Sequence, residues 1–399
     1  MTMLLALAVV VVAGALAYGV ALLWGLRRRR VDIWWRDYLR HLRERRGAPA
    51  AKGPVHVMFA FVDHFEPRWG RADYATEVQR MRRWCEGYPA LCGGHADADG
   101  KPPIHSFFFP SEEYRREHLD DLVALCRSGF GEIEVHLHHD DDTEAGLRAN
   151  LGEFLGRLVQ HGALPVDAAS GEPRWAFIHG NWALDNSRDD GRWCGVNNEL
   201  VVLRELGCYA DYTLPSAPSD TQTSTVNSIY YATDDPARPK SHDKGVPVEV
   251  GKAPSGDLMI VQGPLVLRWK RRFGIPVPAI ENGDIRADNP PTPARIEAWV
   301  RAGVHVRGRP DWVFVKVHTH GTQTRDMEAL LGPPVARMFD YLESAYNDGT
   351  RHKLHYVSAR EMYNVIRAAE HGETGDPGLY RDYVIPPPPY RARAPGDAP

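Results

Sequence analysis

The sequence lacks the features of a disulfide-stabilised protein and of a nucleic-acid-binding protein. It has only five cysteines, an odd number, and no C-x-x-C pair, which argues against a disulfide framework and fits a reducing compartment. The formal net charge is -4, so no basic excess is present to attract nucleic acid. The 399 residues are 43% hydrophobic and 25% charged, which is typical of a folded chain with one large domain or two ordinary ones.

Charged side chains are also missing from the first 26 residues. Residues 4–26 are almost wholly apolar and, as a helix, are long enough to cross a bilayer core of about 30 Å. Four arginines, residues 27–30, follow this run. A cleaved signal peptide would have its basic residues before a shorter apolar run. We therefore expect residues 1–30 to form an uncleaved transmembrane anchor with an arginine stop.

The arginines also predict how the anchor is oriented. Positive residues favour the cytoplasmic side, so the N-terminus would face out and the body would lie in the cytoplasm, at a plasma membrane of the bacterial inner-membrane type. Trp34 and Trp35 fall where an interfacial aromatic belt is expected. Residues 31–53 predict a basic juxtamembrane helix and linker, which either lies on anionic lipid or is a solvated charged segment.

The body of the chain alternates between strand-like and helix-like segments. Strand-like segments occur at 55–62, 104–109, 132–138, 175–179, 209–214 and 312–318, of which 132–138 alternates between polar and apolar residues. This alternation predicts an α/β domain over residues 54–370 with a parallel sheet, either a closed barrel or a doubly wound sheet. A barrel would gather the C-terminal ends of its strands on one face, where such enzymes keep their sites.

Two segments interrupt or follow this pattern. Residues 215–291 are rich in Pro, Gly, Ser and Asp, and we expect an elaborated loop region with a hairpin, formed by strand-like pieces at 228–232 and 258–261. The Pro-rich tail, residues 371–399, is expected to be extended and poorly ordered after Gly375.

The strand at residues 132–138 carries a candidate metal site at its end. Alternation along a strand places His136 and His138 on one face, and His139 with Asp140 crowds the exit of the strand. Two imidazoles beside carboxylates suit a divalent metal with mixed nitrogen and oxygen preference, with zinc as the first choice.

Three other strand ends carry similar groups, namely Asp63-His64, His179-x-Asn181 and His318-x-His320. If the four ends converge, they supply three metal ligands, a base and an acid. A bound ion would lower the pKa of a coordinated water and polarise a carbonyl. A carboxylate would take the proton of the water, and a histidine would protonate the leaving group. Each histidine alone is more simply a hydrogen-bonded or surface residue, but four at strand ends are not expected by chance.

The order of these motifs over residues 54–366 resembles the polysaccharide deacetylases, carbohydrate esterase family four. The resemblance implies a distorted (β/α) barrel that removes acetyl groups from N-acetylated sugars with one divalent metal. The family's first motif is Thr-Phe-Asp-Asp, and Phe61-Val62-Asp63-His64 stands in its place. By this resemblance Asp63 would be the catalytic base and His64 a substitute metal ligand.

The remaining motifs of the family match in part. Its His-x-x-x-His motif has the spacing of His136 to Asp140, which implies both as ligands, with His138 as an alternative on the same strand face. The third motif would fall at residues 179–182, which makes His179 a candidate catalytic residue, although no arginine is in register there. The last motif, Leu-x-His, implies His318 or His320 as the catalytic acid.

We therefore expect a membrane-anchored, metal-dependent hydrolase, an N-deacetylase of an N-acetylated sugar that is lipid-linked or an exopolysaccharide precursor. Its partners would be a carbohydrate and the lipid bilayer. Two alternatives stay open. His-x-His also opens amidohydrolase and phosphoesterase sites, although usually on the first strand. A non-catalytic carbohydrate-binding protein with a degenerate barrel is favoured by the missing arginine. Trp69, Trp182 and Trp193 would stack on sugar or pack in the interior.

Overall fold

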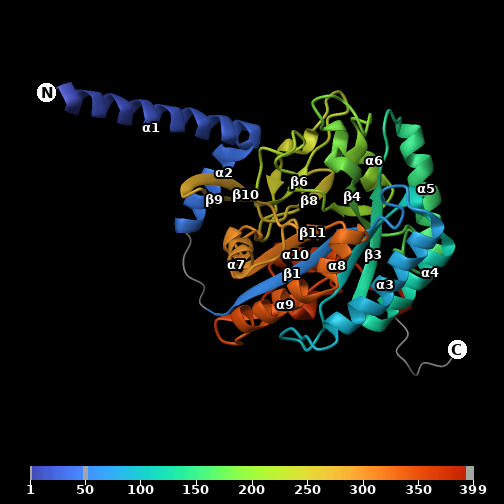
Figure 1. The fold of residues 1–399 in the computed structure, drawn as a ribbon. Helices are drawn as coiled ribbons and strands as arrows, with labels where there is room; N and C mark the ends of the chain where they lie inside the picture. Colours follow the sequence, from blue (N-terminus) through green and yellow to red (C-terminus); the bar gives the residue numbers. More distant parts are fainter. Residues whose placement is uncertain (1, 48–52, 392–399) are drawn as a thin grey trace.

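The computed structural model describes residues 2–47 and 53–391, and these build a ten-stranded sheet with helices around it (Figure 1). The strands of this sheet are β1 (Val55–His64), β2 (His105–Pro110), β3 (Gly131–Leu137), β4 (Trp175–His179), β5 (Cys208–Asp211), β6 (Ile229–Ala232), β7 (Val246–Pro247), β8 (Leu258–Val261), β11 (Trp312–Thr319) and β12 (His352–Tyr356). The helices of the body are α3 (Tyr74–Cys92), α4 (Arg116–Leu125), α5 (Glu144–Gln160), α6 (Glu199–Glu205), α7 (Pro293–Ala302), α8 (Thr324–Leu330), α9 (Pro333–Tyr346) and α10 (Ala359–Glu370).

The sheet is mostly parallel, which confirms the α/β class. Its strand order is β11-β1-β2-β3-β4-β5-β8-β6-β7, and β12 also pairs with β1. Only β6 runs antiparallel to its neighbours, β8 and β7. The two edge strands, β11 and β7, do not pair with each other, so the sheet is open and the predicted closure into a barrel is wrong.

Helix α10 fills the space that a closed barrel would enclose. It begins at a capping box, in which the side chains of Ser358 and Glu361 each accept a backbone N–H of the other residue. Nearly every residue of α10 is buried, and the helix contacts both β1 and β4. The sheet therefore curves around a central helix, and its interior is filled without pairing of the edge strands.

Residues that alternate along β1 pack on opposite faces of the sheet. Phe59 and Phe61 belong to the core beneath α3, α4, α5 and α9, which we call the outer face. Ala60 and Val62 belong to the core around α10, which we call the inner face. Because the period of a strand is two, adjacent residues at a strand end must project to different faces.

The region 215–291 is divided between the main sheet and a separate hairpin. The predicted pieces form β6 and β8, which pair antiparallel with Ile229 opposite Val261. A second hairpin, β9 (Val266–Arg272) and β10 (Ile275–Glu281), forms its own two-stranded sheet. It lies against the N-terminal helix α1 (Thr2–Arg28), where the hydroxyl of Tyr18 donates to the carbonyl of Pro276 at 2.7 Å.

The N-terminal segment forms two helices, α1 and α2 (Val31–Gly47). Over Leu4–Arg28, α1 is long and apolar enough to cross a membrane, and it projects away from the body (Figure 1). The body packs on α2 through Trp34, which is fully buried, so its assignment to an interfacial belt is wrong, whereas Trp35 is 44% exposed. Residues 48–52 of the predicted linker lie outside the described residues.

The tail after Gly375 packs on the body, and the expectation of disorder is wrong for residues 376–391. The guanidinium of Arg381 lies 2.8 Å from both Asp97 and Asp99 and also pairs with Glu361. These ion pairs fix the tail next to the C-terminal end of β12, where Arg381 also donates to the carbonyl of Tyr356. The final residues, 392–399, lie outside the described part of the chain.

Replacing Arg381 by methionine should lower the free energy of unfolding by about 3 kcal/mol, because it leaves the buried carboxylate of Asp97 without its counter-charge. Denaturant unfolding of the detergent-solubilised full chain measures the loss. Arg351→Met is the matched control, since the Arg351 side chain is 80% exposed and pairs with Asp348 at the surface. Equal stability of both variants would mean that the tail is not held by these ion pairs.

Candidate metal centre

Five side chains meet on the inner face at the C-terminal ends of three parallel strands, and we call them the inner cluster. They are His64, Glu66, His136, His138 and His320. His64 ends β1, and Glu66 follows two residues later. His136 lies in β3 and His138 directly follows that strand, while His320 follows β11. The prediction that strand ends would bring metal-ligating groups together holds for these residues.

The carboxylate of Glu66 is the centre of the inner cluster. Its Oε1 lies 3.3 Å from His136 Nε2 and 3.5 Å from His138 Nε2. His64 and His320 also lie next to this carboxylate, and their rings stack with centroids 4.5 Å apart. Glu66 and His136 are buried, whereas the side chain of His138 is 34% exposed, so the cluster reaches solvent at one side.

Hydrogen bonds of the two β3 histidines leave their inward nitrogens without a proton when the rings are neutral. His136 donates through Nδ1 to the carbonyl of Ile178 at 2.7 Å, and His138 donates through Nδ1 to Glu112 at 2.5 Å. Each Nε2 is then a lone-pair acceptor, and both face Glu66, which in its ionised form is also only an acceptor. Three acceptors in contact are favourable around a cation, and two histidines with one glutamate are a known catalytic zinc set. The residues therefore fit a divalent ion.

The electrostatics of the inner cluster favour charged Glu66 and neutral His64. Burial holds the pKa of His64 well below its ordinary value, and the neighbouring His320 and His136 lower it further. Burial alone would raise the pKa of Glu66, but contact with His136 and the neighbouring His320 and His138 lowers it overall. The cluster thus presents one carboxylate and one uncharged imidazole, which are the forms that bind a metal or accept a proton.

Trp182 borders the inner cluster from a strained turn after β4. The turn is a short 3₁₀ helix, η3 (Gly180–Trp182), in which Asn181 and Trp182 have φ of 54° and 57°. The indole lies 6.5 Å from the His64 ring and 6.3 Å from the His320 ring, centroid to centroid. Its buried Nε1–H has no acceptor within the described residues. Strained backbone and an unused donor beside a histidine cluster are features of ligand-binding sites.

Asp63 projects to the outer face, away from the inner cluster. Its carboxylate pairs with His105 Nε2 at 2.9 Å and accepts the backbone N–H of Gly321 at 2.6 Å. The reason is strand alternation, since Asp63 and His64 are consecutive in β1. Asp63 therefore supports the backbone next to His320, and its assignment as the base stays a prediction that this geometry does not favour.

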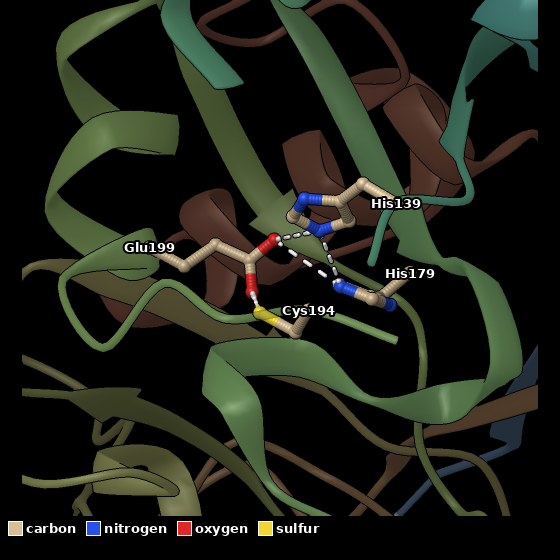
Figure 2. A group of neighbouring side chains, drawn as sticks. All are labelled: His139, His179, Cys194 and Glu199. Atoms are coloured by element: carbon tan, nitrogen blue, oxygen red, sulfur yellow. Dashed lines mark hydrogen bonds and ion pairs between the residues drawn. The ribbon is translucent and has the colours of Figure 1, made fainter. Parts of the chain in front are cut away.

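His179 also lies on the outer face, in a second group of side chains that we call the outer cluster. It contains His139, His179, Cys194 and Glu199, whose side chains point toward one another (Figure 2). The Nε2 atoms of the two histidines are 2.8 Å apart. The predicted single pocket is thus divided by the sheet into an inner and an outer cluster.

Two further predicted residues, Asp140 and His318, are not members of either cluster. Asp140 is exposed and accepts the backbone N–H of Trp193. His318 is buried on the inner face, where burial and the charge of Lys316 hold its pKa well below the ordinary value. For the two alternatives that the sequence leaves open, the structure places His138 beside His136 and places His320 beside His64.

The sequence did not single out the carboxylates of the two clusters, Glu66 and Glu199, or Glu112, which accepts from His138. Glu66 follows His64 by two residues. The alternation of side chains along an extended segment could therefore have predicted that both lie on the same face. Glu112 and Glu199 lie in the first turns of helical segments, where acidic residues are expected for capping alone. Cys194 lies in a loop and carries no spacing motif.

No protein-family model matches the chain, and no curated protein matches it. The resemblance to polysaccharide deacetylases therefore rests on the motifs, and the structure adds a mostly parallel, open α/β sheet with possible ligand groups at its strand ends.

Proposed function

We propose that the inner cluster is the metal-dependent active site of a hydrolase that removes acetyl groups from an N-acetylated sugar. The observation that carries the proposal is the approach of His136 Nε2 and His138 Nε2 to the Glu66 carboxylate, at 3.3 and 3.5 Å. Glu66, His136 and His138 would hold the ion, with zinc as the first choice. When bound, zinc polarises a carbonyl and lowers the pKa of a coordinated water toward neutrality.

Two histidines beside the metal ligands would move the protons of the reaction. The ring of His64 lies next to the ligand His136, with centroids 4.8 Å apart, and burial keeps it unprotonated, so it is placed to take the proton of the attacking water. His320 is only half-buried and stacks on His64, so it can donate a proton to the leaving amine and recover it from solvent. This assignment gives the role of the base to His64, in place of Asp63, which is bonded to His105 on the outer face.

Trp182 would bind the sugar and its acyl group. A half-buried indole offers an apolar face to a sugar ring, and its free Nε1–H can donate to the carbonyl oxygen as negative charge develops there. The apolar helix α1 favours a substrate at a membrane surface, such as a lipid-linked sugar or an exopolysaccharide precursor. With arginines following α1, the body would lie on the cytoplasmic side.

Replacing Trp182 by phenylalanine should lower kcat for deacetylation by about 10²-fold, because the ring is kept but one hydrogen-bond donor to the reacting oxygen is lost. Steady-state rates on the same N-acetylated sugar measure the effect, and metal content should not change. Trp35→Phe, on the exposed side of α2, is the matched control. If kcat is unchanged in Trp182→Phe, the indole of Trp182 does not take part in the reaction.

The choice among substrate classes is tested by product release. Full-length protein in detergent is incubated with N-acetylated sugars, O-acetylated sugars, phosphomonoesters and simple cyclic amides. The proposal predicts acetate from an N-acetylated sugar. Phosphate release or ring opening without acetate would favour the phosphoesterase or amidohydrolase alternative.

A further inference from the structure

The outer cluster brings together four metal-ligating side chains from three separate segments. His139 follows β3, His179 ends β4, and Cys194 and Glu199 come from the loop before α6 and its first turn. Three of the four residues are fully buried, and the side chain of His139 is 5% exposed. Figure 2 shows both imidazoles directed at the Glu199 carboxylate, with the Cys194 sulfur on its far oxygen.

When both imidazoles are neutral, the hydrogen bonds of this cluster leave three acceptors facing one another. His139 donates through Nδ1 to Asp142 at 2.8 Å, and His179 donates through Nδ1 to the carbonyl of Gly180 at 2.5 Å. In neutral rings both Nε2 atoms are then acceptors, yet they are 2.8 Å apart. They also lie 3.3 and 3.4 Å from Oε1 of Glu199, a buried oxygen that has no donor in the part of the chain that the structure describes.

Cys194 adds a sulfur ligand to this arrangement. Its Sγ lies 3.4 Å from Oε2 of Glu199. The backbone N–H groups of Asn186 and Val196 point at the sulfur at 3.2 and 3.5 Å. Burial next to Glu199 raises the pKa of this thiol, so a bound metal would have to displace its proton, and the two backbone donors would then stabilise the thiolate that binds metal.

We propose that His139, His179, Cys194 and Glu199 form a second, closed zinc site. Two imidazoles, a thiolate and a carboxylate give the four ligands of a structural zinc centre. Ligands about 2.0 Å from a tetrahedral zinc lie about 3.3 Å from each other. The Glu199 distances of 3.3 and 3.4 Å already match this spacing. A zinc ion replaces the unfavourable contact among three acceptors by three bonds.

The second ion would hold together the loops that carry the inner cluster. His139 is adjacent to His138, and His179 begins the turn that contains Trp182. The loop that carries Cys194 lies close to the segment after His139, because the backbone N–H of Asp142 donates to the carbonyl of Cys194 at 3.0 Å. Gly195 permits this approach: its φ is 96°, and a Cβ there would lie 2.8 Å from Asp142 N. The inference stands independently of the function proposed for the inner cluster.

The wild-type full chain provides the first test. It is purified in detergent without chelators, its metal content is measured, and X-ray absorption is recorded on the bound zinc. We expect about two ions per chain if both clusters are loaded and one if only the outer cluster is. In either case the spectrum should contain a sulfur neighbour at about 2.3 Å, one per zinc if only the outer cluster is loaded and one per two zincs if both clusters are. Zinc without a sulfur neighbour, or a chain without zinc, would overturn the proposal. The short contact between His139 and His179 would then be explained by a proton shared between their Nε2 atoms.

Variants then assign the two ions separately. Cys194→Ser should lose one ion and the sulfur signal, while Cys85→Ser, outside both clusters, keeps them. His136→Ala should lose one ion but keep the sulfur signal, so failure of the inner site and failure of the outer site are distinguishable. In cobalt-loaded protein, the thiolate charge-transfer band should be present in His136→Ala and absent in Cys194→Ser. A band that persists in Cys194→Ser would place the thiolate elsewhere and contradict the proposal.

Discussion

The variant His136→Ala is expected to lose the ion of the inner cluster and about 10³-fold in hydrolysis. The expected loss corresponds to several kcal/mol of transition-state stabilisation by the metal. His136 is fully buried, and its Nδ1 is held by the carbonyl of Ile178, so Nε2 is fixed toward Glu66 and its removal takes away one of the three proposed ligands. Metal content and acetate release on the same sample measure both effects.

The control for this variant is His371→Ala, which removes an exposed imidazole at the end of α10. It should keep full metal content and full activity. An inactive His136→Ala protein that still holds its full metal content would separate the ion from the chemistry. Full activity in a protein that has lost the ion would show that the reaction does not take place at the inner cluster.

The variant His320→Gln is expected to keep its metal and lose about 10²- to 10⁴-fold in kcat, the usual contribution of a general acid. Glutamine can still form hydrogen bonds but cannot donate a proton to the leaving amine. The fall of the wild-type rate at high pH, caused by deprotonation of the acid, should be missing from the variant. Steady-state kinetics between pH 5 and 10 measure both the loss of kcat and the change in the pH profile.

His318→Gln is the informative comparison, because the sequence left the acid open between His318 and His320. The His318 ring is buried beside Lys316 and is not among the groups that meet at Glu66. If the loss of kcat and of the high-pH limb occurred in His318→Gln instead, the acid would have to be reassigned. Circular dichroism of both variants checks that the fold is retained.

The sequence predicted the parallel α/β class but not the helix inside the sheet. The alternation of β-branched runs with helical segments is a local signal, and it located β1, β3, β4 and β11 to within a few residues. The sequence of α10 has the polar residues of a surface helix. Those residues are buried because each has a distant partner: Arg360 pairs with Glu132 at 2.8 Å, and Asn364 donates to the carbonyl of Ile385. Such pairs are not visible in local periodicity.

The candidate site was predicted in part for a related reason. Parity along a strand gave the shared face of His136 and His138, and their rings lie 4.5 Å apart. The same rule separates Asp63 from His64, but the family resemblance assigned both to one pocket. Glu199 reaches its histidines only through the fold, since α6 is 60 residues from His139 in the sequence.

Zinc titration of metal-depleted full-length protein tests the central claim most directly. Acetate release from N-acetylated sugars is followed as zinc is added back, in wild type and in His136→Ala. We predict that wild-type activity is absent after depletion and returns as the inner cluster fills, and that His136→Ala stays inactive at every zinc concentration that restores wild type. Acetate release that survives depletion, or no release from any N-acetylated sugar with both clusters loaded, would contradict the account.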